Sequence, residues 1–167
     1  LAVYGSSSPS ATSTLTSVSV LRVSLTADIF AGVGGQLAAD GGVDPTKGTG
    51  FLVDNASVEL GLASNATGTQ SWTGVSFSAT SAGLVGITGL NLTVKELYAR
   101  VNGAATDGTV VDWAALDAVK FKDLTHTVSK QVGGKLTLTI DSVVLIAGSF
   151  ALSQSTQDLA VDRKSVV

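Results

Sequence analysis

Short alternations of apolar and polar residues recur along most of the chain and predict β-strands. Val18 and Val20 alternate with polar residues, and from Leu21 to Val33 the apolar residues continue on the other parity. Because consecutive side chains of a strand point to opposite faces, a change of parity predicts a β-bulge or a strand that crosses between layers. We therefore expect a long strand with an irregularity near Leu21.

A second stretch has the same change of phase, since the apolar residues of 90–94 give way to a set on the other parity that begins at Leu97. Each phase change comes before or within a similar sequence: residues 30–44 read FAGVGGQLAADGGVD and residues 98–112 read YARVNGAATDGTVVD. Both contain an aromatic residue, small and apolar residues, Ala-Ala, Asp-Gly and a second Asp. Repetition of this kind predicts stacked structural units, each a strand that leads into a turn.

Other segments predict further strands. Residues 51–63 and a short strand around Val75 and Phe77 flank the turn-like sequence 64–69, which predicts a hairpin. The glycines of 82–89 predict a bend or a close approach of two backbones. The longest apolar pattern, 136–152, is interrupted near Ser142 and has apolar residues on both faces, which predicts a strand buried on both sides.

One segment has helical spacing. Asp112 is suited to cap a short helix that carries Trp113, Leu116 and Val119 on one side. In a chain with few aromatic residues, Trp72 and Trp113 are expected to anchor the core.

These elements predict an all-β fold, elongated and repeat-built, arranged as an antiparallel β-sandwich or a solenoid-like stack. The Ser/Thr-rich residues 1–17 form a linker or an edge segment in this prediction, residues 18–153 form the repeat-built β domain, and residues 154–167 form a polar C-terminal segment.

Composition narrows the class of protein. Hydrophobic residues make up 44% of the chain and charged residues 14%, the net charge is -3, and cysteine is absent. Disulfides therefore do not hold the fold together, and the acidic balance argues against nucleic acid as a partner. No run of 18 apolar residues occurs, so we expect no membrane insertion. The chain starts at Leu1 and lacks methionine, which indicates a processed form or a piece of a longer protein, and its composition favours an extracellular location.

The repeated aspartates are the candidate site. Asp40 and Asp44 in one copy, and Asp107 and Asp112 in the other, supply carboxylates beside glycine turns, as a Ca²⁺ site requires. The spacing is not that of an EF-hand. The alternative is that Asp and Gly occur here because they form turns.

Catalysis is not predicted. His126 is the only histidine and lies in an alternating sequence, and no Gly-x-Ser-x-Gly elbow precedes a helical segment. We therefore expect the protein not to be an enzyme.

Residues 86–103, GITGLNLTVKELYARVNG, and 145–153, LIAGSFALS, resemble the repeat regions of giant, type-I-secreted bacterial surface proteins of the adhesin kind. The resemblance implies an extracellular structural or adhesive repeat, although the glycine-aspartate calcium repeats of that family are missing. Expected partners are neighbouring repeats or further copies, which would assemble through strand edges or through residues 1–17, and a surface ligand. The alternative function is a calcium-dependent extracellular binding module that uses the Asp-Gly loops.

Overall fold

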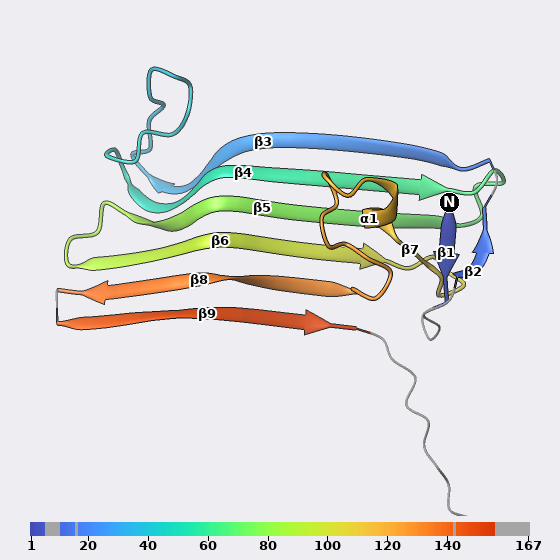
Figure 1. The fold of residues 1–167 in the computed structure, drawn as a ribbon. Coiled ribbons are helices and arrows are strands. Elements are labelled where there is room, and N and C mark those ends of the chain that lie inside the picture. Colours follow the sequence, from blue (N-terminus) through green and yellow to red (C-terminus); the bar gives the residue numbers. More distant parts are fainter. Residues whose placement is uncertain (6–10, 16, 142, 156–167) are drawn as a thin grey trace, which may run out of the picture.

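A six-stranded antiparallel sheet dominates the computed structural model, which describes residues 1–5, 11–15, 17–141 and 143–155 (Figure 1). Each strand pairs with the strand before it in the sheet, in the order β3-β4-β5-β6-β8-β9. The strands are β3 (Ser19–Val33), β4 (Thr49–Ser64), β5 (Ser71–Val85), β6 (Leu90–Gly103), β8 (Lys130–Ile140) and β9 (Val144–Gln154). The prediction of an all-β antiparallel fold is confirmed, as is the hairpin predicted around residues 64–69.

A small second layer covers one end of one face of this sheet. It contains β1 (Ala2–Tyr4), β2 (Ala11–Thr14) and β7 (Val110–Val111), which pair in the order β2-β1-β7, and the single-turn helix α1 (Trp113–Leu116). The main core lies between this layer and the sheet, and its fully buried members are Val3, Trp72, Val111, Trp113, Phe121 and Leu124. Both tryptophans are therefore core anchors, as predicted.

Two glycines make the seat of Trp113. Gly61 and Gly74 pair directly across β4 and β5, and a Cβ atom on either would lie within 2.6 Å of the Trp113 ring. The Trp113 indole N–H donates to Asn102 Oδ1 at 3.2 Å, and Asn102 in turn donates to the backbone oxygens of Val111 and Thr125. The two glycines fix where the Trp113 ring rests on the sheet, and Asn102 fixes the direction of its N–H. The second layer therefore has one defined position on the sheet.

Three aligned bulges cross the middle of the sheet. Asn55 on β4, Thr80 on β5 and Glu96 on β6 lie side by side, and Asn55 and Glu96 have left-handed backbone φ angles of 50° and 53°. The neighbouring strands β3 and β8 lack this extra residue, so each spans the same stretch of the sheet with one residue fewer. The extra residue changes the parity within each central strand, so Ala56 and Val53 both lie in the same small hydrophobic cluster as Ala79 and Ala82.

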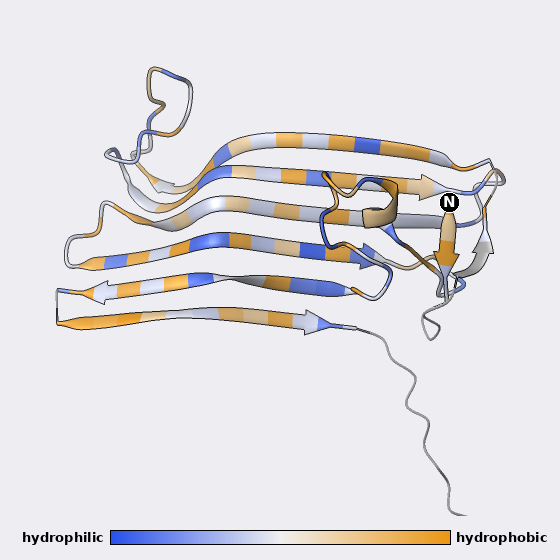
Figure 2. Ribbon diagram, in the orientation of Figure 1, coloured by the Kyte–Doolittle hydropathy of each residue, from blue (hydrophilic) through white to orange (hydrophobic). Residues whose placement is uncertain are grey.

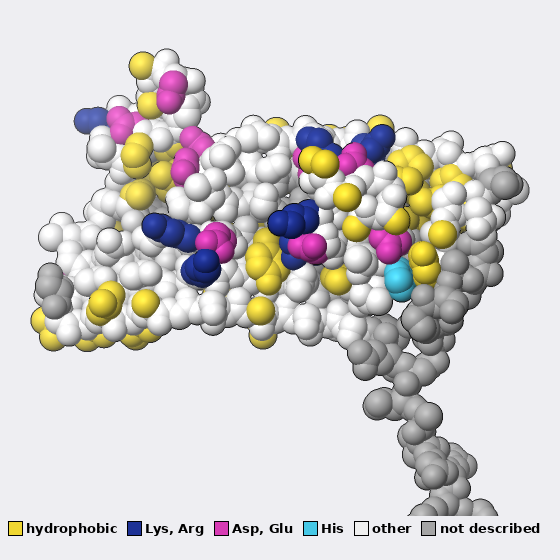
Figure 3. All heavy atoms as spheres, in the orientation of Figure 1, with side chains coloured by type: hydrophobic (Ala, Val, Ile, Leu, Met, Phe, Trp, Pro, Cys, Tyr) yellow, Lys and Arg dark blue, Asp and Glu magenta, His cyan; other side chains and the backbone are white. Residues whose placement is uncertain are grey.

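The two faces of the sheet are chemically different. Arg22, Gly61, Gly74 and Asn102 share one cross-strand row and contact the second layer; we call this side the covered face. Beyond the second layer the covered face carries most of the polar and charged side chains of the sheet, and Figure 3 shows its charged side chains gathered in clusters. We call the opposite side the open face. Hydrophobic and hydrophilic residues alternate along the strands in Figure 2, and most of the hydrophobic ones point to this face.

Three sequence predictions need correction. The irregularity of β3 does not lie near Leu21: the pairing with β4 is regular from Ser19 to Ala27 and shifts between Ala27 and Ile29. Val18 and Val20 gave the appearance of a phase change because the second layer makes the covered face apolar at this end. Val20 pairs with Ala63, which belongs to the core, and Val18 packs against that core. The phase change before Leu97 is confirmed by the shift between Lys95 and Tyr98.

The apolar stretch 136–152 is a hairpin of two strands, and the prediction of a strand buried on both sides is wrong. β9 is exposed at every position because it is the outer strand of the sheet and no layer of the described structure covers it. The helix predicted after Asp112 forms with that cap but ends at Leu116, which leaves Val119 exposed.

The predicted sandwich or solenoid-like stack does not describe the sheet as a whole. The sheet is open rather than closed, and the second layer is too small to form a sandwich over its whole length. Within residues 1–17, β1 is the central strand of the small sheet, β2 is an outer strand and Val3 is buried. Residues 6–10 and 16 lie outside the described structure, as do residues 156–167 of the polar C-terminal segment. In the described part of the chain, no helix has the length and apolar character needed to cross a membrane.

Candidate functional site

The open face is a continuous apolar surface that crosses all six strands. Residues that pair in one row lie on the same face, and the rows on this side consist almost entirely of Val, Leu, Ile, Phe and Ala. One row contains Leu25, Val58, Phe77, Ala99, Val132 and Leu152. Beyond the bulges, another contains Phe51, Leu84, Leu92, Leu138 and Ile146. No described residue outside the sheet packs over these rows as a second layer, so the face is available for contact.

The outer edges of β3 and β9 pair with no other strand among the described residues. β9 is exposed along its 11 residues, and Leu145 and Ile146, on opposite faces, are 72% and 50% exposed. β3 is exposed over most of its length, with Leu21 and Leu25 each 58% exposed. Native proteins usually protect such edges with lysine, proline or a bulge. β9 has neither a charged residue nor a proline over Val144–Gln154, so this edge is unprotected.

Ionic contacts of the covered face hold the second layer in place. Glu59 is buried and accepts hydrogen bonds from Ser24 on β3 and from Lys120, whose Nζ lies 3.1 Å from Glu59 Oε1. Arg22 of β3 reaches Asp117 after α1 at 2.8 Å. These pairs connect the edge strand β3 to the segment that carries Trp113, and they give the charged side chains of this face a structural role.

The loop 34–48, which contains Asp40 and Asp44, is attached to the sheet by a residue that sequence reasoning did not select. Asp28 accepts hydrogen bonds from the backbone N–H groups of Val43, in the loop, and Asn55, at the bulge, at 3.0 and 2.9 Å. These two hydrogen bonds hold the pKa of Asp28 below its usual 3.8, and the one from Asn55 has the larger effect. The one sequence signal for this role is that Asp28 is the single acidic residue of β3 and lies between Ala27 and Ile29.

Within that loop, the two predicted calcium ligands make local turns. Asp40 accepts from the Gly42 N–H, and Asp44 accepts from the Thr46 hydroxyl and the Thr46 N–H at 2.7 and 2.9 Å. The Thr46 contacts lower the pKa of Asp44. Both carboxylates thus have the hydrogen bonds expected of Asp in turns.

The other predicted pair also has partners. Asp107 accepts from the Thr109 hydroxyl and N–H, which lower its pKa, and from the Gln70 amide. Asp112 caps α1 by accepting from the Ala115 N–H at 2.9 Å, and its second oxygen lies 3.2 Å from His126 Nδ1. The His126 ring stacks on Tyr4, with 3.9 Å between the ring centroids. The single histidine therefore joins α1 to β1.

The structure does not bring the two Asp pairs together. β3 and β6 run in opposite directions because they are three places apart in an antiparallel sheet, so the loops that follow them lie at opposite ends. In the described residues no group of three or more Asp, Glu, His or Cys side chains is placed to hold a metal ion. The geometry supports the turn role that the sequence offered as the alternative, and calcium binding stays a prediction.

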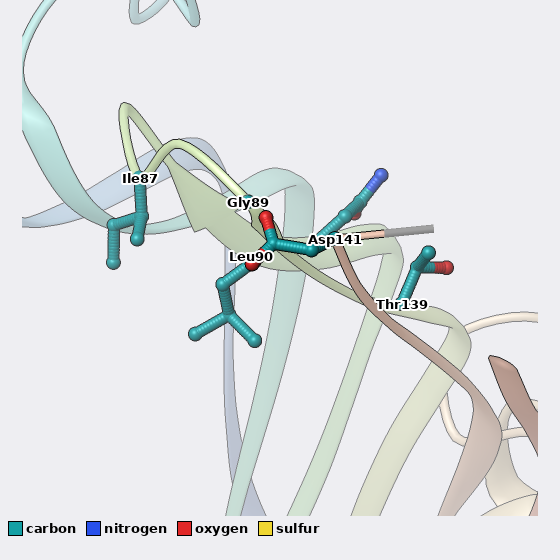
Figure 4. Close-up of a pocket in the computed structure, with 6 residues that line it drawn as sticks. Ile87, Gly89, Leu90, Thr139 and Asp141 are labelled. Atoms are coloured by element: carbon teal, nitrogen blue, oxygen red, sulfur yellow. The ribbon is translucent and has the colours of Figure 1, made fainter. Parts of the chain in front are cut away.

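A hollow of about 370 Å³ lies at the end of the sheet, between the β5–β6 turn and the end of β8 (Figure 4). Ile87 and Leu90 line its apolar part, and Thr139 and Asp141 its polar part. Asp141 is the only titratable residue of the described lining, so the hollow contains no pair of groups suited to acid–base catalysis.

No protein-family model, curated protein or solved structure matches the chain.

Proposed function

We propose that the protein is an extracellular structural or adhesive unit of a repetitive bacterial surface protein or filament, and that copies associate through the edges of the six-stranded sheet. The observation that carries the proposal is the unprotected β9, which offers 11 consecutive residues for strand pairing without a charge or a proline. The extracellular and adhesive parts of the proposal rest on the composition and on the resemblance of residues 86–103 and 145–153.

The strand directions favour extension of the sheet. The sheet has six strands in alternating directions, so its two outer strands, β3 and β9, run in opposite directions. A second copy in the same orientation would place its β3 beside β9 in antiparallel sense and continue the alternation. Such a contact joins two different surfaces and does not close on itself, so it generates a filament or a row of tandem units rather than a dimer.

The side chains of β3 support the same contact. Arg22 and Asp28 are the charged residues of this strand, and both are occupied within the chain, by Asp117 and by the loop 34–48. The β3 edge is therefore free of mobile charges that would repel a neighbouring strand. By contrast, β1 pairs with β2 on one side and with β7 on the other, so both of its edges are already occupied within the chain.

Lysine substitutions on β9 test this proposal. We expect the double variant Leu145→Lys/Ala147→Lys to remain folded and to lose filaments in electron micrographs, because lysines on an edge strand oppose pairing with a neighbour. Both positions lie on the polar side of the sheet, so the open face is unchanged. The matched control is Thr137→Lys/Thr139→Lys, since Thr137 and Thr139 pair with Ala147 and Leu145 one strand further in. Equal assembly of both double variants and the native chain, or no assembly of the native chain, would contradict edge association.

A further inference from the structure

The open face has the size of a stable interface. Six strands spaced about 4.8 Å apart and at least 11 residues long give a flat area of roughly 900 Å². A stable interface between two proteins buries about 800 Å² on each partner. The open face therefore has enough area on its own for a lasting contact, and apolar patches of this size on soluble proteins mark interaction surfaces.

The chemistry of the open face selects an equally apolar partner surface. Across its described rows Lys130 is the only charged residue, and it lies beside the edge, in the row that ends at Gln154. The covered face of another copy does not fit, because that face carries Lys95, Lys135 and Glu96, which such a contact would remove from water. A second open face satisfies both requirements, since it has the same length, the same width and the same apolar rows.

We infer that the open face packs against the open face of a second copy of this chain, which gives a two-layered sandwich of sheets. Two sheets that pack face to face lie about 10 Å apart and interdigitate their inner side chains. Because the same surface is used by both partners, the contact is closed and two-fold symmetric. It uses side chains of the central strands and leaves the edges of β3 and β9 free, so it is independent of edge association.

Single lysines on the open face test this inference. Val58 lies in the middle of the face and Leu62 nearer its end, where it is 39% exposed; both are on β4, an interior strand. We expect the native chain to sediment as a dimer or as a larger species with an even number of chains. In Val58→Lys and Leu62→Lys, the ratio of species with an odd number of chains to species with an even number should rise at least tenfold at equal concentration. Thr137→Lys, on the opposite face, is the control and should sediment as the native chain does. Far-UV circular dichroism establishes that each variant is folded, and Leu62→Lys keeps the test valid if Val58→Lys unfolds.

The outcomes separate the face from the edge. If Leu145→Lys/Ala147→Lys forms dimers and the β4 lysines abolish them, both associations hold. If the β4 lysines leave the mass of a folded chain unchanged, face pairing is wrong, whatever the edge variants do. A native chain that is monomeric at tens of micromolar overturns the inference as well. Flotation of the native chain with neutral phosphatidylcholine vesicles, lost in Leu62→Lys, would identify a lipid surface as the occupant and would also overturn it.

Discussion

Adding one methyl group beneath Trp113 should destabilise the protein by an amount that depends on the presence of the indole ring. In Gly74→Ala the new Cβ would lie 2.6 Å from Trp113 Cε2 and 2.7 Å from Cδ2 and Nε1. The ring cannot move away freely, because Phe121 packs against it with 5.4 Å between centroids and Asn102 accepts its N–H. Overpacking of this kind costs about 1–3 kcal/mol, and displacement of the ring would also weaken a buried hydrogen bond worth about 1 kcal/mol. We expect a loss of about 2 kcal/mol in the free energy of unfolding.

The double-mutant cycle with Trp113→Ala isolates this contact. Without the indole the three closest contacts of the added methyl are gone, and replacing a strand glycine with alanine then gains about 0.5 kcal/mol. The expected coupling energy between Gly74→Ala and Trp113→Ala is therefore about 2 kcal/mol or more. Gly148→Ala on β9 is the control, since no atom lies within 4 Å of its added Cβ.

Urea unfolding followed by far-UV circular dichroism measures all four proteins with the same probe. Trp113→Ala alone should cost about 3–5 kcal/mol, so the whole cycle is run in sucrose, which strengthens burial equally in each protein. Additive effects of the two substitutions, with a coupling energy under about 0.5 kcal/mol, would show that Gly74 is not the seat of the ring and that the second layer is held by other contacts.

Three further predictions concern the aspartates. The lowered pKa of Asp28 means that its contacts with Val43 and Asn55 stabilise the fold above about pH 4 and that this stabilisation is lost as the pH falls through the lowered value. Asp28→Ala should therefore cost about 1 kcal/mol near neutrality, and its urea midpoint should approach that of the native chain as the pH falls through the lowered pKa of Asp28; a constant gap contradicts this. Asp112→Ala removes the cap on Ala115 and should lower stability by about 1 kcal/mol in thermal melts, whereas Asp112→Asn should retain most of it. Calcium in excess should raise the Tm over that in chelator if the Asp-Gly loops bind it, and an unchanged Tm refutes calcium binding.

Local patterns in the sequence predicted the elements that depend on neighbouring residues. The hairpin around residues 64–69, the phase change before Leu97 and the cap at Asp112 each follow from alternation, turn composition or capping chemistry within a few positions. These features form wherever the rest of the chain lies, because their contacts are local.

The parts that could not be predicted depend on contacts between distant segments. Val20 looks like a member of an alternating strand, yet its face becomes apolar only because β1, β7 and α1 pack there. The exposure of β9 also has no local signal, since an apolar strand on an open face has the same sequence as one buried between layers. For the candidate site, the sequence identified aspartates that make turns, whereas Asp28 and the open face required knowledge of strand order.

The aligned bulges at Asn55, Thr80 and Glu96 restrict how the length of this sequence can change during evolution. Deleting one residue at Asn55 alone would turn Val53 and Phe51 to the covered face and bring Leu52 and the charged Asp54 to the open face. The same holds at the other two bulges, because each central strand carries its own extra residue. An insertion or deletion in the middle of one strand is therefore tolerated only when its neighbours change in concert, whereas the loops at the two ends of the sheet are free to vary in length.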